Sequence, residues 1–207
     1  MRQSGWRLAI KRSVDIVGAA GGLLVLAPVA VLGALAVRYS MGSPVLFKQQ
    51  RPGRNSRPFV LFKFRTMLNT VDADGRPLSD DARLTKTGQV LRSLSLDELP
   101  QLWNVLRGEM SFVGPRPLLM QYLARYTPRQ ARRNDVLPGI TGWAQVHGRN
   151  TVTHEQKFEM DVWYVENWSL RLDAQVLWLT LSTLLRRSGI SAPQHATMPE
   201  FMGSSNG

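Results

Sequence analysis

The chain has 207 residues, with 26 Lys or Arg against 15 Asp or Glu, and carries a formal net charge of +11 at pH 7. This length suffices for one domain with a real core, and the basic surface favours partners such as anionic lipid, phosphorylated ligands or nucleic acid. The absence of cysteine excludes disulfides, cysteine-ligated zinc and thiol nucleophiles.

The N-terminal part of the chain predicts a membrane helix. Residues 16–37 form an uncharged apolar run. As an α-helix rising ~1.5 Å per residue, this run reaches about 33 Å, enough to cross a bilayer core of roughly 30 Å. It is too long for the apolar region of a cleaved signal peptide. A buried helix of a soluble domain is the other interpretation of such a run.

The surroundings of this run favour re-entry over a straight span. Pro28 lies inside it, where a proline removes a backbone hydrogen bond and kinks a helix. Basic residues flank the run on both sides, and the positive-inside rule places both flanks in the cytoplasm. We therefore predict a monotopic, re-entrant helix kinked at Pro28, and a straight span is the alternative.

The next part of the chain predicts a small β element and a loop. Residues 45–47 and 59–62 are strand-like, and residues 51–55 between them have turn chemistry. Residues 69–82 are polar and contain four Asp, which is typical of a solvated surface loop. Residues 82–94 are basic and are predicted to be helical.

A further helix is predicted over residues 97–107. Leu99, Trp103 and Leu106 recur at helical spacing and indicate one buried face. Gly108 is expected to end this helix, because glycine is the usual residue after a helix C-terminus.

The following segment presents a single arginine from a stiff loop. Arg116 lies between Pro115 and Pro117, and proline fixes its own backbone angle φ. Residues 118–134 are predicted to be an amphipathic basic helix, and residues 138–146 a glycine-punctuated turn followed by a short strand.

Together these elements predict an α+β, mainly helical fold with a small β element. We expect a basic segment and re-entrant membrane helix over residues 1–40, a cytoplasmic catalytic domain over 41–187 and a flexible tail over 188–207. Residues 170–187 form an apolar helix that is too short for a second span and is predicted to be an amphipathic interfacial helix.

One acidic motif in this basic chain has two interpretations. Ser95 followed by Glu98 before an apolar helix matches a capping box, in which Glu98 serves only to cap the helix. Pro100 conflicts with this interpretation, because a helix that begins at Ser95 places Pro100 where an N–H donor is needed. The cap assignment therefore stays open.

The functional interpretation gives the two acids separate tasks. On a helix, Asp97 and Glu98 diverge by about 100°, so they cannot flank one glycosidic bond as a glycosidase pair does. One can attack an electrophilic phosphorus while the other holds a divalent cation, since Mg²⁺ takes only one or two protein carboxylates. Arg92 and Arg116 favour this interpretation, because an anionic nucleophile attacking a phosphate needs cations nearby.

Several longer motifs follow one another along the chain. They are Lys11-Arg12-x-x-Asp15, Gln50-Arg51-Pro52-Gly53, Lys63-Phe64-Arg65-Thr66-Met67, Arg92 to Gln101, Ser111 to Pro117, Pro138 to Gln145 and Asp161-x-x-Tyr164. Through them the chain from Lys11 to Ile190 resembles the bacterial sugar transferase family, the monotopic polyprenyl-phosphate phosphoglycosyl transferases. In size and detail it is similar to the small members that transfer diacetylbacillosamine phosphate.

The resemblance implies a reaction and its location. The family transfers a sugar 1-phosphate from a UDP-sugar to a polyprenyl (undecaprenyl) phosphate and releases UMP, at the cytoplasmic face of the inner membrane. This is the first membrane step in assembly of a glycoprotein, O-antigen, capsule or exopolysaccharide. No residue in the motifs is tied to a sugar hydroxyl or N-acetyl group, so the sequence assigns no particular sugar.

The resemblance also implies site residues. Asp97 matches the nucleophile that forms an aspartyl phosphosugar intermediate, and Glu98 matches the ligand of Mg²⁺, the implied cofactor. The residues implied to bind phosphate or substrate are Arg92, Arg116, Lys63 and Arg65. One departure is Ala27 before Pro28, where the family often has Ser.

A non-catalytic alternative comes from another class of protein. A membrane-anchored basic module would bind anionic lipid or nucleic acid through its charge. The arginines lie in Pro/Gly loops around carboxylates rather than along a recognition helix, which argues against nucleic acid as a partner.

Overall fold

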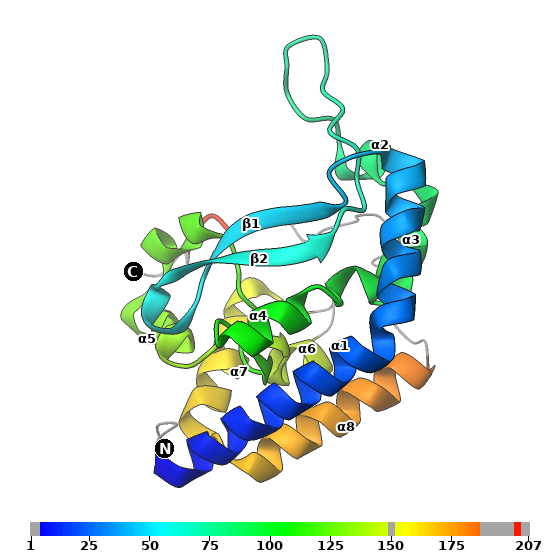
Figure 1. The fold of residues 1–207 in the computed structure, drawn as a ribbon. Helices are drawn as coiled ribbons and strands as arrows, with labels where there is room; N and C mark the ends of the chain where they lie inside the picture. The colour runs from blue at the N-terminus through cyan, green and yellow to red at the C-terminus, as the bar shows by residue number, and fades with distance from the viewer. Residues whose placement is uncertain (1–4, 149–151, 187–200, 204–207) are drawn as a thin grey trace.

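The structure is a computed structural model that describes residues 5–148, 152–186 and 201–203. It confirms an α+β, mainly helical fold in which two small sheets lie among helices (Figure 1). The strands are β1 (Leu46–Pro52), β2 (Pro58–Phe64), β3 (Ser111–Val113) and β4 (Gly139–Thr141). The α-helices are α1 (Gly5–Met41), α2 (Asp80–Arg83), α3 (Lys86–Ser93), α4 (Gln101–Arg107), α5 (Pro128–Ala131), α6 (Trp143–His147), α7 (His154–Asn167) and α8 (Leu170–Arg186). The short 3-10 helices are η1 (Arg54–Ser56), η2 (Leu96–Glu98), η3 (Met120–Arg125) and η4 (Arg132–Asp135).

Helix α1 is one continuous helix that bends part-way along its length (Figure 1). Pro28 lies inside it, and the backbone hydrogen bond lost at an interior proline accounts for the bend. Leu24 and Val25 near this proline are 79% and 73% exposed. Among the described residues α1 is the one helix long and apolar enough to cross a membrane.

Small residues let both arms of α1 approach the rest of the domain. A Cβ atom at Gly22 would lie 3.3 Å from the Leu102 side chain, and one at Gly33 would lie 3.4 Å from Phe64. The first arm therefore joins the core around α4, and the second joins the core beneath β2 and α3. The bend allows one helix to pack against two separate clusters.

Buried polar contacts tie the first arm of α1 to the domain. Lys11 Nζ forms an ion pair of 2.6 Å with Asp173 of α8 and donates to the Val113 carbonyl at 3.0 Å. Asp15 accepts hydrogen bonds from Ser111 Oγ and the Phe112 N–H, each at 3.0 Å. Charged groups are buried at low cost only when they are paired. These contacts therefore fix the position of the N-terminal part of α1 on the domain.

The two strands that the sequence predicted form the hairpin β1–β2, which is antiparallel. The surface loop after it is exposed and protrudes from the top of the molecule in Figure 1. The predicted helix over residues 170–187 is confirmed as α8, which lies beside the first arm of α1.

Three local predictions were wrong. Residues 118–134 are not one helix but η3, α5 and η4, because Thr127 and Gln130 form a capping box with Pro128 that starts a new helix. The predicted helix over 82–94 is divided by Thr85, which caps α3. Residues 143–147 form α6 rather than a strand, whereas the strand of this segment is β4.

The predicted flexible tail lies mostly outside the described residues. Within the part described, Phe201 is buried against Tyr122 and Phe158, and its N–H donates to the Tyr122 hydroxyl at 3.0 Å. At this position the tail is packed on the domain and is not free.

We predict that Lys11→Met destabilises the protein by about 3 kcal/mol or more, because it leaves the Asp173 carboxylate buried without its ion-pair partner. Thermal and urea unfolding of the wild type and the variant, both in one detergent, measure the change in the free energy of unfolding. Arg107→Gln, which breaks an ion pair between a half-exposed Arg107 and a partly buried Glu109, is the control and should change the melting temperature little. Equal stability of Lys11→Met and wild type would contradict the prediction.

Candidate active site

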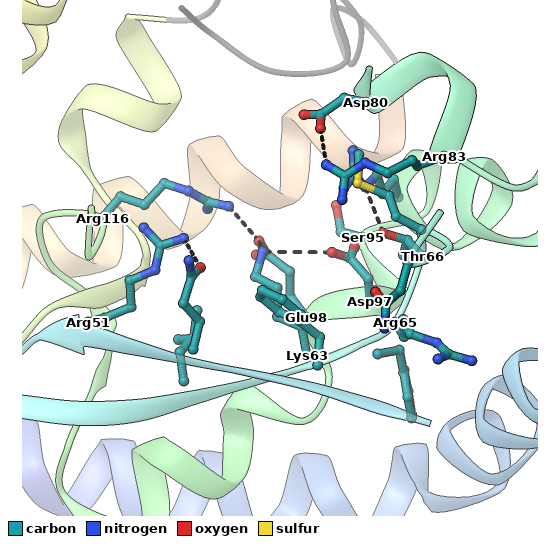
Figure 2. A pocket seen from close by; sticks show the side chains of 17 residues that line it. Arg51, Lys63, Arg65, Thr66, Asp80, Arg83, Ser95, Asp97, Glu98 and Arg116 are labelled. Carbon is teal, nitrogen blue, oxygen red and sulfur yellow. Dashed lines mark hydrogen bonds and ion pairs between the residues drawn. The ribbon is translucent and has the colours of Figure 1, made fainter. Parts of the chain in front are cut away.

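A cavity of about 660 Å³ lies between the β1–β2 hairpin, α3 and η2. It is strongly basic, since six of its lining side chains are cations and three are acids. The cations are Arg51, Lys63, Arg65, Arg83, Arg92 and Arg116, and the acids are Asp80, Asp97 and Glu98. Figure 2 shows Asp97 and Glu98 in the middle of this cavity, with arginines on both sides. An excess of positive charge around a cavity suits a ligand with several phosphate charges.

The backbone around the acidic pair rules out the capping box. Ser95 adopts a left-handed conformation with φ 55°, and its side chain makes no cap hydrogen bond. Asp97 and Glu98 belong to the 3-10 helix η2, and α4 begins only after Pro100, which occupies its N-cap. Pro100 thus lies where a missing N–H costs nothing, and the Glu98 carboxylate is free for other partners.

Those partners are two cations from distant parts of the chain. Glu98 Oε1 accepts from Lys63 Nζ of β2 at 2.6 Å and from Arg116 Nη2 at 2.7 Å. Burial raises the pKa of Glu98, but Arg116 and Lys63 outweigh burial and lower the pKa to about 2. Glu98 is therefore an anion at any physiological pH.

Asp97 has a different environment although it is the next residue. Its closest cation is Lys63, at 3.7 Å from Oδ2. Burial is the largest influence and raises the pKa of Asp97, while Lys63 opposes this shift and the Glu98 charge reinforces it. The pair is thus divided into a carboxylate held by two cations and a more basic carboxylate with a looser partner, and greater basicity favours nucleophilic attack.

The other sequence-predicted residues lie in two positions. Arg92 lines the cavity and its Nε donates to Thr66 Oγ1 at 3.1 Å. Arg65 also lines the cavity, but in Figure 2 its side chain points away from Asp97 and Glu98. Its guanidinium donates to the Met41 and Gly42 carbonyls, the latter at 2.9 Å. Arg65 therefore holds the C-terminus of α1.

Two cavity cations were not singled out by sequence reasoning. Arg51 donates to Gln49 Oε1 at 2.6 Å, and burial together with the nearby Arg116 charge lowers the pKa of Arg51 to about 10. Arg83 forms an ion pair of 2.6 Å with Asp80. The Gln50-Arg51-Pro52-Gly53 motif was a signal for Arg51, whereas the chain around Arg83 offered none.

The donor set fits a magnesium ion better than a zinc ion. A closed zinc site needs a cluster of at least three protein ligands. Within the residues that the structure describes, no three His, Asp or Glu side chains lie close enough together to form one. Mg²⁺ takes one or two carboxylates and completes its shell with phosphate oxygens and water. Glu98 can supply such a carboxylate inside the basic cavity.

Comparison with known proteins identifies relatives over most of the chain. A family model described as Bacterial sugar transferase matches residues 6–187. The "Uncharacterized sugar transferase EpsL" of Bacillus subtilis (strain 168) is 54% identical over 198 residues, which cover 95% of this chain and 98% of that protein.

Two longer relatives carry more specific names. The "Undecaprenyl-phosphate glucose phosphotransferase" of Komagataeibacter xylinus is 41% identical and the match covers 86% of this chain. The "UDP-galactose-lipid carrier transferase" of Erwinia amylovora is 39% identical and the match covers 87% of this chain. The matched parts are only 36% and 41% of these two proteins, so the chain corresponds to a portion of each.

The pKa of Glu98 leads to a prediction about stability. Because the folded pKa lies below the ordinary 4.5, the ionised Glu98 stabilises the fold above about pH 4.5, and this contribution is lost as the pH falls towards 2. Glu98→Gln should therefore lower the free energy of unfolding at pH 7 by about 2 kcal/mol, and the deficit should narrow on acidification. Urea unfolding of both proteins from pH 7 to pH 3 tests this, and a constant deficit would refute it.

Proposed function

Because the chain belongs to the bacterial sugar transferase family, we propose that it transfers a sugar 1-phosphate from a UDP-sugar to polyprenyl phosphate and releases UMP. The observation that carries this proposal is the division between Asp97 and Glu98 inside a basic cavity. The names of relatives agree with it, since they include a UDP-galactose and an undecaprenyl-phosphate transferase. Their sugars differ, so the family supports the reaction and leaves the sugar to be measured.

Asp97 is the nucleophile of the proposed reaction. Its carboxylate oxygen attacks the phosphorus that carries the sugar, and the bond from this phosphorus to the UMP oxygen breaks. UMP leaves with the electron pair of that bond, and an aspartyl phosphosugar remains. A phosphate oxygen of the lipid then attacks the same phosphorus and releases the Asp97 carboxylate. The two displacements need no oxidant and no further co-reactant.

The cations of the cavity assist both displacements. Lys63 lies near both carboxylates, and Arg92 and Arg116 line the same cavity. Positive charge at these positions stabilises the charge that develops on phosphate oxygens during transfer. Glu98, with Asp97 beside it, would hold Mg²⁺, which when bound neutralises phosphate charge as a Lewis acid.

We further propose that α1 is a re-entrant helix and that the active site faces the cytoplasm. Both arms of α1 contact the same domain, through Lys11 near one end and through the carbonyls bound by Arg65 at the other. A straight span would carry one end to the opposite side of the bilayer. The exposed apolar residues near Pro28 lie between the two attachments, which suits an apex inserted in one leaflet. This arrangement agrees with an enzyme whose acceptor is a membrane lipid.

The covalent step predicts a half-reaction. Incubation with a UDP-sugar and Mg²⁺ but no lipid acceptor should release about one UMP per active site, because Asp97 retains the phosphosugar. Intact-mass spectrometry should show the adduct, and peptide mapping should locate it on Asp97. An active preparation without an adduct would eliminate the covalent mechanism.

Matched variants separate catalysis from simple binding. Asp97→Asn should abolish turnover because an amide is a poor nucleophile, and Glu98→Gln should raise the Mg²⁺ concentration needed for half-maximal rate. If Asp97→Asn is inactive and still binds anionic vesicles in a salt-dependent manner, binding alone does not account for activity. If no UDP-sugar in a broad panel yields UMP while vesicle binding is strong, the non-catalytic basic module is the better description.

The topology proposal is tested by labelling, which the absence of native cysteine makes clean. Gln3→Cys and Lys48→Cys flank the membrane helix, and Asp74→Cys in the exposed loop marks the side of the catalytic domain. In sealed inside-out vesicles an impermeant maleimide should label all three positions. Protection of position 3 alone would make α1 a true span.

A further inference from the structure

A buried ion pair between η4 and α7 holds the main chain at Arg116. The Arg133 guanidinium donates to Asp161 Oδ2 from Nε at 3.0 Å and from Nη2 at 2.6 Å. The same Nη2 donates to the Arg116 carbonyl oxygen at 2.8 Å. Arg133 and Asp161 are 2% and 3% exposed, and neither lines the active-site cavity. The pair therefore touches the active-site loop from behind its main chain.

The guanidinium itself has little freedom to move. Its remaining branch, Nη1, donates to the Tyr126 hydroxyl at 3.2 Å. Its central carbon lies 5.5 Å from the centre of the Phe158 ring and 5.7 Å from that of Tyr126. A planar donor held on three branches and packed against two rings is a stiff support.

The loop that it supports is stiff on its other side as well. The Gly114 N–H donates to Thr141 O at 2.9 Å, and the Pro115 carbonyl accepts from the Gly139 N–H at 3.0 Å. With the Arg116 carbonyl bound to Arg133, consecutive carbonyls of the loop have fixed partners. Proline on each side of Arg116 limits rotation further.

This support matters because packing does not fix the Arg116 side chain. That side chain is 44% exposed, yet its Nη2 lies 2.7 Å from Glu98 Oε1. A half-exposed arginine has many rotamers, so the position of its main chain decides how often the guanidinium reaches Glu98 and the cavity. A buried ion pair is by itself weak support for stability, since an apolar pair of similar size is often as stable.

We propose that Arg133, oriented by Asp161, is a positioning residue that fixes the Arg116 loop so that Arg116 reaches the phosphates of the sugar nucleotide. The inference rests on the proposed function, because it explains what fixes the position of Arg116, one of the cations of that active site. Arg133 acts only through Arg116 and does not touch the substrate. The effect of losing Arg133 should therefore depend on whether Arg116 is present.

The test replaces the ion pair without leaving a buried charge. Arg133→Met combined with Asp161→Leu should fold with a melting temperature near that of wild type. It should raise the KM for the UDP-sugar and lower kcat/KM by roughly 10- to 100-fold. Arg133→Lys, which keeps the charge but has one nitrogen in place of the fork, should show the same change in KM to a smaller degree.

A double-mutant cycle with Arg116→Ala makes the test specific. In that background the Arg133/Asp161 replacement should lower kcat/KM by less than about twofold, because the group that it positions is gone. Arg129→Gln is the control, since Arg129 joins α5 to α7 through Glu159 at 2.9 Å on the exposed surface. It should leave KM and kcat unchanged.

The outcomes separate the two proposals. An unchanged KM in a folded Arg133/Asp161 variant, or a full additional loss in the Arg116→Ala background, would overturn the positioning role. Arg133→Lys supplies the same comparison should the double replacement not fold. Absence of UMP release by wild-type protein across a panel of UDP-sugars would instead reject the proposed function.

Discussion

The geometry of the active site depends on one buried amide. The Asn104 side chain accepts from the Phe62 N–H at 3.1 Å and donates to the Val60 carbonyl at 2.7 Å, so it pairs with β2 as a neighbouring strand would. Asn104 belongs to α4, which directly follows Asp97 and Glu98, and β2 carries Lys63. An unsatisfied amide in this fully buried position would be costly. The amide therefore fixes the distance between a cation and two acids that come from separate elements.

Helix α1 is packed into the same structure that holds the active site together. Arg12 donates to the Val105 and Leu106 carbonyls at 2.6 and 2.7 Å in the last turn of α4, where helix carbonyls run short of N–H partners. Arg65 likewise donates to a carbonyl at the end of α1, although Arg65 directly follows strand β2 at the active site. Each helix is thus capped by a cation that belongs to the other part of the molecule. Removal of α1 would expose apolar core and remove the Arg12 hydrogen bonds from the C-terminus of α4.

Sequence patterns over a few residues predicted the elements that form through interactions between neighbouring residues. The strand-like residues 59–62 and the apolar stretch 170–187 predicted a strand and a helix that the structure confirms. The pattern at Ser95 failed because a left-handed residue and Pro100 divide the expected helix, and sequence spacing does not report backbone angles. Arg133 and Asp161 escaped notice as a pair because they are 28 residues apart and meet only after α7 packs on η4. Long-range pairing of this kind has no local signature.

The contrast between two adjacent carboxylates follows from the same arrangement. In a 3-10 helix neighbouring side chains diverge by about 120°, so Asp97 and Glu98 leave η2 in different directions. Glu98 forms ion pairs with two cations that other elements hold in place. The β1–β2 hairpin positions Lys63, and the loop around Pro115 and Pro117 positions Arg116. Asp97 is buried and its closest cation is Lys63 at 3.7 Å, and the charges of Lys63, Arg116 and Arg92 do not offset burial and the Glu98 charge. Opposite shifts in pKa therefore need no difference in residue chemistry. They arise because burial raises the pKa of both acids, but two cations lie in direct contact with Glu98, whereas the nearest cation to Asp97 is 3.7 Å away.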